Sequence, residues 1–194
     1  MIGPVAMAGI SFEERLFGPL VSGRECGTCT ACCVEITIEE PALRKPARTM
    51  CAHCTGAGCS IYAARPEACR SWFCAWRRVA DLPDGLSPDR CGLLATLAEN
   101  PAAENPLARL YIIVQWLDER PITKSAEADQ LLAAMRRHAL PIWVGSGDRM
   151  SLHFPRQEIA LHLMHGSEAP AEIAEEVDGW RNRLRQLSAV SQGH

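Results

Sequence analysis

All ten cysteines of this 194-residue chain lie between Cys26 and Cys91. Four of them occupy eight positions, 26–33, in the stretch CGTCTACC. The full spacing is C-x2-C-x2-C-C, then seventeen residues, then C-x2-C-x4-C-x9-C-x4-C, with Cys91 sixteen residues further on. A short segment with this many thiols can pair them in disulfides, use them as metal ligands, use them for redox chemistry or simply bury them. Which of these it does decides how the segment folds.

The N-terminus and the apolar runs bear on the compartment in which these thiols work. Residues 1–20 have no basic start followed by a long apolar stretch, and Glu13, Glu14 and Arg15 interrupt them, so they do not resemble a signal peptide. The longest strongly apolar run, 110–114, is far below the roughly 20 residues that cross a membrane as a helix. We therefore expect a cytoplasmic protein without a membrane partner. Thiols stay reduced in that compartment, which disfavours disulfides.

The charge of the chain excludes one class of partner and supports another. A formal net charge of −3 argues against a nucleic-acid-binding protein that works by bulk electrostatics. Between Arg24 and Arg78, by contrast, eight basic residues outnumber five acidic ones, a balance of +3 before any thiol ionises. Two divalent ions held by eight thiolates would add −4 and leave −1. Buried free cysteines do not explain this density of thiols, and we predict a metal ion as the partner.

The spacing indicates how the thiols would share metal. Close C-x2-C pairs let two sulfurs reach one ion from a tight turn, as in structural zinc sites. The adjacent Cys32 and Cys33 are expected to point in different directions, which suits two ions or a multinuclear cluster. Cys69 and Cys74, five positions apart, would lie about 140° apart around a helix axis. They would share an ion only if the helix ends between them or the ion lies at its tip.

Two longer stretches resemble a known family. CGTCTACC at 26–33, followed by CAHCTGAGCSIYAARPEACRSWFCAW at 51–76, is similar to the YkgJ-like, or CxxCxxCC, family of zinc- or iron-chelating proteins. The resemblance covers about residues 24–92 and includes LPDGLSPDRCG at 82–92. It implies that the ligands are Cys26, Cys29, Cys32, Cys33, Cys51, Cys59 and Cys69, with Cys74 in an F-x-C-x-W extension. The match is weaker at Cys54 and Cys91. The predicted ligand set includes Cys54, which forms a C-x2-C pair with Cys51, and omits Cys91.

The predicted cofactor is zinc, with iron or an Fe–S cluster as the alternative, because all-thiolate coordination suits each of them. The sequence contains no Ser/His/Asp set, carboxylate pair or nucleotide-binding loop, so we predict no catalytic residue. We expect a cytosolic, cysteine-rich metal-binding protein without catalytic activity. The alternative is an Fe–S redox protein or a metal-dependent enzyme accessory to a modification reaction.

Several residues near the cysteines are predicted to support the metal without binding it. His53 lies between two cysteines, but with so many thiols nearby we do not expect it to be a ligand. Pro66 suits the first turn of a helix that carries Cys69. Arg65 and Arg70, on either side, are predicted to place positive charge near the site through bonds to sulfur or to nearby carboxylates.

The local patterns predict an α+β fold in three parts. A lead-in at 1–23 precedes a small cysteine-rich metal-binding module at 24–92, with short helices and little sheet, and an α+β unit at 107–188 packs on this module. In the module we expect a strand at 35–39 and a helix that begins at Pro66. In the unit we expect, in order, a strand at 110–117, a helix at 125–139 capped by Ser125, a hairpin of 141–144 and 149–154 joined by GSGD, and helices at 156–165 and 170–187.

Overall fold

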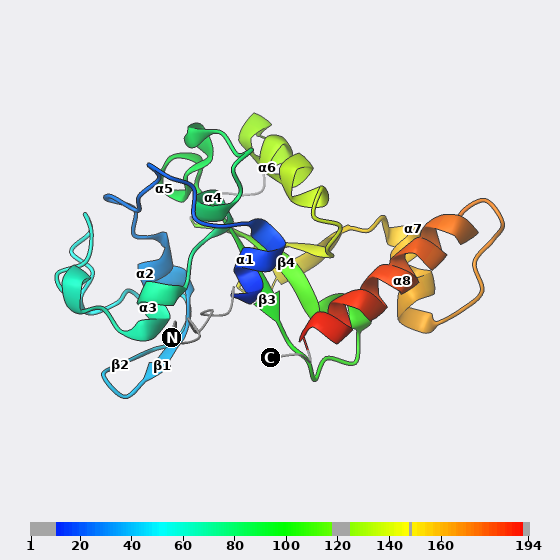
Figure 1. Cartoon of the computed structure of the whole chain (residues 1–194), viewed down its shortest axis with the longest axis horizontal. Helices are drawn as coiled ribbons and strands as arrows, with labels where there is room; N and C mark the ends of the chain where they lie inside the picture. Colours follow the sequence, from blue (N-terminus) through cyan, green and yellow to red (C-terminus); the bar gives the residue numbers. More distant parts are fainter. Residues whose placement is uncertain (1–10, 118–124, 148, 192–194) are drawn as a thin grey trace, which may run out of the picture.

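The computed structural model describes residues 11–117, 125–147 and 149–191, and it has an α+β fold built on a four-stranded sheet (Figure 1). The strands lie in the order β3 (Leu93–Glu99), β4 (Leu110–Trp116), β5 (Ile142–Ser146) and β6 (Arg149–Phe154). Neighbouring strands are antiparallel except β4 and β5, which are parallel. Parallel neighbours need a crossover connection, and α6 (Ala126–Arg136) lies between these two strands in the chain.

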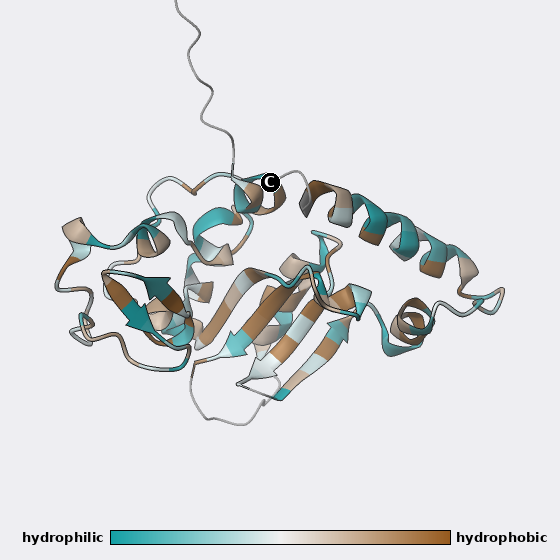
Figure 2. Ribbon diagram, turned by 90° about the horizontal axis from the view of Figure 1, so that it is seen from below, coloured by the Kyte–Doolittle hydropathy of each residue, from teal (hydrophilic) through white to brown (hydrophobic). Residues whose placement is uncertain are grey.

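The main core is shared between the sheet and the helices α1 (Phe12–Phe17), α4 (Ala75–Arg78) and α6. The side chain of Ser125 accepts a hydrogen bond from the N–H of Ala128 at 3.1 Å, which confirms the predicted cap of α6. Leu131 and Met135 of α6, four residues apart, are both buried on the face that this spacing creates. Figure 2 shows hydrophobic residues concentrated along the strands of the sheet.

A second core lies at one end of the molecule, between α7 (Gln157–His165) and α8 (Ala174–Ser191) (Figure 1). Trp180 of α8 packs edge-on against Phe154 of β6, with ring centroids 5.1 Å apart. The helices predicted at 156–165 and 170–187 are present, although the second begins only at Ala174. No helix in the described part of the chain is long and apolar enough to cross a membrane.

The cysteine-rich segment lies at the opposite end of the molecule from α7 and α8 (Figure 1). It contains α2 (Ala31–Glu35), a hairpin of β1 (Ile38–Glu40) and β2 (Leu43–Lys45), the 3-10 turn η1 (Tyr62–Ala64) and α3 (Glu67–Ser71). The segment attaches to the edge strand β3, where Ala31, Cys74 and Leu94 form a small buried cluster. The chain passes through η2 (Asp84–Leu86) and α5 (Pro88–Cys91) into β3, and η3 (Pro106–Ala108) precedes β4.

The stretch 82–92 joins the cysteine-rich segment to the sheet. Gly92 ends α5 with φ 69° and ψ 16°, a left-handed conformation that glycine adopts without a clash of Cβ, and so directs the chain into β3. Leu82 and Leu86 are buried in the main core. The end of the predicted metal-binding module therefore packs into the core of the sheet. The three-part division itself stays a prediction, and residues 1–10 of the lead-in lie outside the described residues.

The strand at 110–117 and the hairpin are confirmed as β4, β5 and β6, while Asp148 of the GSGD turn lies outside the described residues.

Two expectations about the cysteine-rich segment are wrong in detail. Glu35 ends α2, so the predicted strand begins only at Ile38. The helix that begins at Pro66 is interrupted, because the backbone is extended at Trp72 and Cys74 and separates α3 from α4. This break lets Cys74 turn into the buried cluster on β3.

Candidate metal centre

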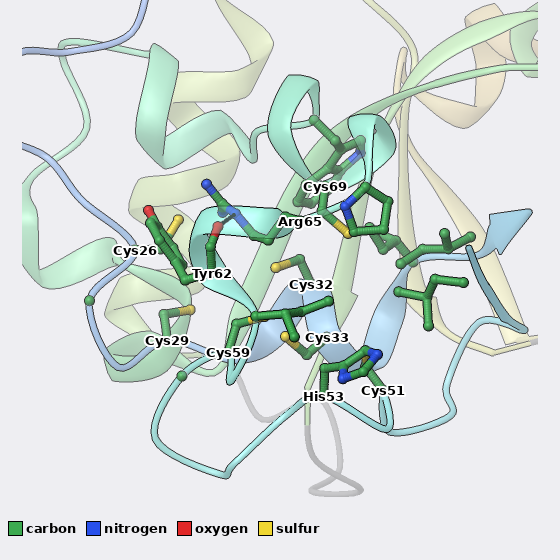
Figure 3. Close-up of a pocket in the computed structure, with 18 residues that line it drawn as sticks. Cys26, Cys29, Cys32, Cys33, Cys51, His53, Cys59, Tyr62, Arg65 and Cys69 are labelled. Atoms are coloured by element: carbon green, nitrogen blue, oxygen red, sulfur yellow. Dashed lines mark hydrogen bonds between the residues drawn. The ribbon is translucent and has the colours of Figure 1, made fainter. Parts of the chain in front are cut away.

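One pocket at the cysteine-rich end of the molecule is lined by seven of the ten cysteines (Figure 3). They are Cys26, Cys29, Cys32, Cys33, Cys51, Cys59 and Cys69, the same seven that the family resemblance implies. The free space between the walls is about 60 Å³, well below the roughly 300–1,000 Å³ of pockets for organic ligands. The pocket therefore has the size for an ion or a small cluster.

Two C-x2-C pairs form the tight turns that their spacing predicts. The N–H of Cys29 donates to the carbonyl of Cys26 at 2.8 Å, and the N–H of Cys54 donates to the carbonyl of Cys51 at 2.9 Å. Gly27 has φ 52° in the first turn, a conformation that favours glycine. The first turn places both of its cysteines at the pocket, whereas only Cys51 of the second turn lines it.

Cys32 and Cys33, which were expected to point in different directions, both line this one pocket. Neighbouring residues of a helix are about 100° apart around its axis. A pocket that borders α2 over such an angle can therefore be lined by both side chains. Figure 3 shows Cys32, Cys33, Cys59 and Cys69 around the middle of the pocket, with Cys26 and Cys29 on the side where Tyr62 lies.

The loop after Cys51 is held against α2 and brings a further thiol to the pocket. The N–H of Cys51 donates to the carbonyl of Cys33 at 2.9 Å, which ties the second group of cysteines to the first. Cys54 and Cys59 pair across the loop as an isolated antiparallel bridge, and Cys59 thereby reaches the pocket. His53 also lines the pocket, and its predicted role as a non-ligand stays a prediction.

Cys69 reaches the pocket from α3. Pro66 is the cap residue directly before this helix, as the sequence indicates. The side chain of Glu40 in β1 accepts a hydrogen bond from the N–H of Ala68 at 2.5 Å, and a carboxylate is favourable at the positive end of a helix. The hairpin of β1 and β2 therefore holds the start of α3. The helix ends at Ser71, so Cys69 and Cys74 do not share one continuous helix.

The two arginines beside Pro66 take different positions. Arg65 lines the pocket, with its guanidinium 3.7 Å from the centroid of the Tyr62 ring and its Nε donating to the Tyr62 carbonyl at 3.0 Å. Arg70 instead pairs with the carboxylate of Glu67 at 2.7 Å, and both side chains are exposed. Arg65 is thus the arginine that places its charge at the pocket.

Three cysteines are absent from the pocket lining: Cys54, Cys74 and Cys91. Cys74 is buried in the cluster that attaches the segment to β3, and Cys29 packs against this cluster. The thiol of Cys91 lies 3.4 Å from the carbonyl oxygen of Leu86 and 3.6 Å from that of Leu93, to which it donates. Cys91 is therefore satisfied by backbone acceptors away from the other thiols.

Four thiols of the segment, those of Cys29, Cys33, Cys69 and Cys74, have raised pKa values and so favour their protonated forms when no cation is near. The hydrogen-bonded thiol of Cys32 raises the pKa of Cys33, and burial raises it further. Burial raises the pKa of Cys69, and the charges of neighbouring cysteines add to this effect. Burial also raises the pKa of Cys29, and it raises that of Cys74 to about 11. A metal cation reverses this preference, because it stabilises the thiolate and displaces the proton.

Sequence reasoning missed the structural roles of two cations near the cysteines. Lys45 is 5% exposed; burial lowers its pKa, whereas the charges of Cys51 and Cys33 raise it. Arg24 stands two residues before Cys26, and its guanidinium donates to carbonyls at the end of α4 and just beyond it. In the sequence, Lys45 and Arg24 are recognisable only as basic residues close to cysteines. That pattern does not indicate that their side chains donate hydrogen bonds to backbone carbonyls.

The side chains as they stand do not make a finished metal site. In the described ranges, no group of three or more Cys, His, Asp or Glu residues is arranged so that it could hold a metal ion. None of the family models, curated proteins or solved structures compared with this chain matches it. The ligand roles of the nine predicted cysteines and the resemblance to the YkgJ-like family therefore stay predictions.

Proposed function

We propose that this chain is a metal-binding protein that holds zinc, or alternatively iron, through the thiols of the pocket, as the YkgJ-like resemblance implies. The observation that carries this proposal is that seven cysteines from separate stretches of the chain line one small pocket. All ten cysteines are free thiols, so no disulfide withdraws any of them. We place the protein in a reducing compartment such as the cytoplasm, where such thiols persist.

Small side-chain movements would complete the centre. The turn at Cys26 and Cys29 and the helices α2 and α3 fix the backbone positions of the thiols. Each cysteine changes rotamer by rotation about one bond, so sulfurs that border one pocket can turn towards a shared ion. Ile36, Leu43 and Trp72 form apolar walls of the pocket and limit the access of water to the sulfurs. A bound ion would crosslink α2 and α3, which are only five residues long, with the turns that carry the other thiols.

An Fe–S redox protein is the second candidate, and the number of thiols favours it. Seven cysteines at one pocket exceed the four that a tetrahedral zinc ion needs. Cys32 and Cys33 border the same pocket, as neighbouring ligands of a multinuclear cluster would. In this case the chain would bind the cluster through its thiols, and the cluster would supply the electron transfer.

Replacing thiols of the pocket tests the proposal. We expect the double variant Cys33→Ser/Cys59→Ser to bind zinc more than about 100-fold more weakly, because lost ligands outweigh the roughly 10- to 100-fold effect of residues that only support ligands. Cys91→Ser is the matched control, since Cys91 lies outside the pocket lining, and it should retain its metal. Metal per chain after dialysis and chelator competition are the measurements. Full metal content in the double variant, or an equal loss in the control, would contradict the proposal.

A further inference from the structure

Lys45 is a buried cation at the end of β2, directly behind the helix that carries two of the pocket thiols. Its Nζ donates hydrogen bonds to the carbonyls of Val34 at 3.0 Å, Ile36 at 2.5 Å and Pro46 at 3.1 Å. An ammonium group has three N–H donors, and these three acceptors use all of them. The charge of Lys45 is therefore held in one position.

Two of these acceptors belong to the end of α2. The last carbonyls of a helix have no partner within the helix and carry partial negative charge. By binding the carbonyls of Val34 and Ile36, Lys45 fixes the final turn of α2. The directions in which Cys32 and Cys33 leave this helix therefore depend on Lys45.

The surroundings of Lys45 are rich in groups that become negative when metal is bound. Burial lowers the pKa of Lys45, whereas negative charge on Cys51, Cys33, Glu35 and Cys32 raises it, so these groups lie close enough to Lys45 to interact with its charge. Four thiolates around one divalent ion leave a net charge of −2, that is, four times −1 plus +2. Buried negative charge is unfavourable unless a cation lies close to it. Lys45 is a cation in position to balance such a centre from behind the pocket.

We infer that Lys45 is a positioning residue of a metal centre that carries net negative charge, built from thiolates without a neutral ligand such as histidine. This inference rests on the proposed function. Lys45 orients the thiols of α2 through its hydrogen bonds, and its charge stabilises the thiolate–metal centre. A residue that only closed the end of α2 would need the hydrogen bonds but not the charge.

Three substitutions separate these contributions. Lys45→Gln keeps a hydrogen-bond donor but removes the charge, Lys45→Arg keeps the charge, and Lys45→Met removes both. Arg44 is the matched control position, because it precedes Lys45 in β2 but is exposed. Arg44→Gln removes the same charge from the other side of the strand.

The test is a titration of the metal-free full-length protein with zinc ions, under anaerobic reducing conditions, against a chromophoric chelator. We expect Lys45→Gln and Lys45→Met to bind zinc about 10- to 100-fold more weakly than the unsubstituted protein. Lys45→Arg should stay within a few-fold of it, and Arg44→Gln should equal it. Circular dichroism of each zinc-loaded variant reports whether it is folded, and the Gln and Arg variants decide the result if the Met variant does not fold.

The outcomes distinguish this inference from the function on which it rests. If Lys45→Gln binds zinc as tightly as the unsubstituted protein, or if the Gln and Arg variants weaken binding equally, the charge of Lys45 has no role and the inference is overturned. If the unsubstituted protein itself binds no zinc in this assay, the proposal of a zinc centre fails, and the role of Lys45 in such a centre falls with it.

Discussion

Removing the metal from the purified protein is expected to unfold residues 26–74 while the four-stranded sheet stays folded. The elements of this segment have three to five residues each, too few to be stable alone. Between positions 26 and 73, all of which the structure describes, the only buried apolar side chains are Ala31, Ile38 and Cys51. A structural metal ion contributes on the order of 10 kcal/mol to folding in such cases.

Hydrogen exchange read by mass spectrometry measures this effect segment by segment. Peptides from 26–74 should lose their protection when a chelator removes the metal under reducing conditions. Peptides from β4 and β5 are the internal control, because these strands are central in the sheet and pair along their lengths. Residues 75–91 should also stay protected, since Ala75, Val79, Leu82 and Leu86 belong to the main core. Unchanged protection of 26–74 in protein verified to be metal-free would contradict the coupling of metal and fold.

Arg24→Met is expected to lower the stability of the whole chain by about 3 kcal/mol, because it leaves several polar groups without their charged partner. The Arg24 side chain is only 10% exposed and donates to the carbonyls of Trp76 at 2.6 Å, Val79 at 2.9 Å and Ala80 at 3.2 Å. It also donates to the carbonyl of Leu82. These bonds hold the chain before the first cysteine against the end of α4.

Thermal unfolding of the metal-loaded protein tests this expectation. A loss of about 3 kcal/mol corresponds to a fall in Tm of roughly 6–12 °C for a chain of this length. Arg90→Met is the matched control, because Arg90 borders the same surface hollow as Arg24 but is exposed. It should change Tm by no more than about 1 °C, as surface substitutions away from such contacts do. Equal Tm values for the two variants would show that Arg24 does not hold this part of the chain.

The elements with local signals were predictable from the sequence. Ser125 marks the start of α6 by its capping side chain, and the β-branched and aromatic residues of 110–117 form β4. The strand β3 was missed, because Leu93–Glu99 is rich in leucine and alanine, which favour helices in isolation. It is a strand because each of its residues pairs with one in β4, and such pairing is not visible in local composition.

The positions of the cysteines at the pocket were more predictable than their supports. The C-x2-C spacing requires tight turns, and the structure has them at Cys26 and Cys51. The supporting cations were not predictable, because Lys45 and Arg24 donate mainly to backbone carbonyls. Every residue type supplies a carbonyl, so the sequence carries no pattern for these contacts.

The metal content of the full-length protein, purified without oxygen and analysed for its elements, tests the central claim most directly. We expect at least one equivalent of zinc or iron per chain that survives dialysis. A colourless sample with zinc would favour a zinc centre, and a brown sample with iron would favour an Fe–S cluster. A folded protein that contains neither metal, with the seven pocket thiols open to alkylation, would contradict the claim that the pocket cysteines hold metal.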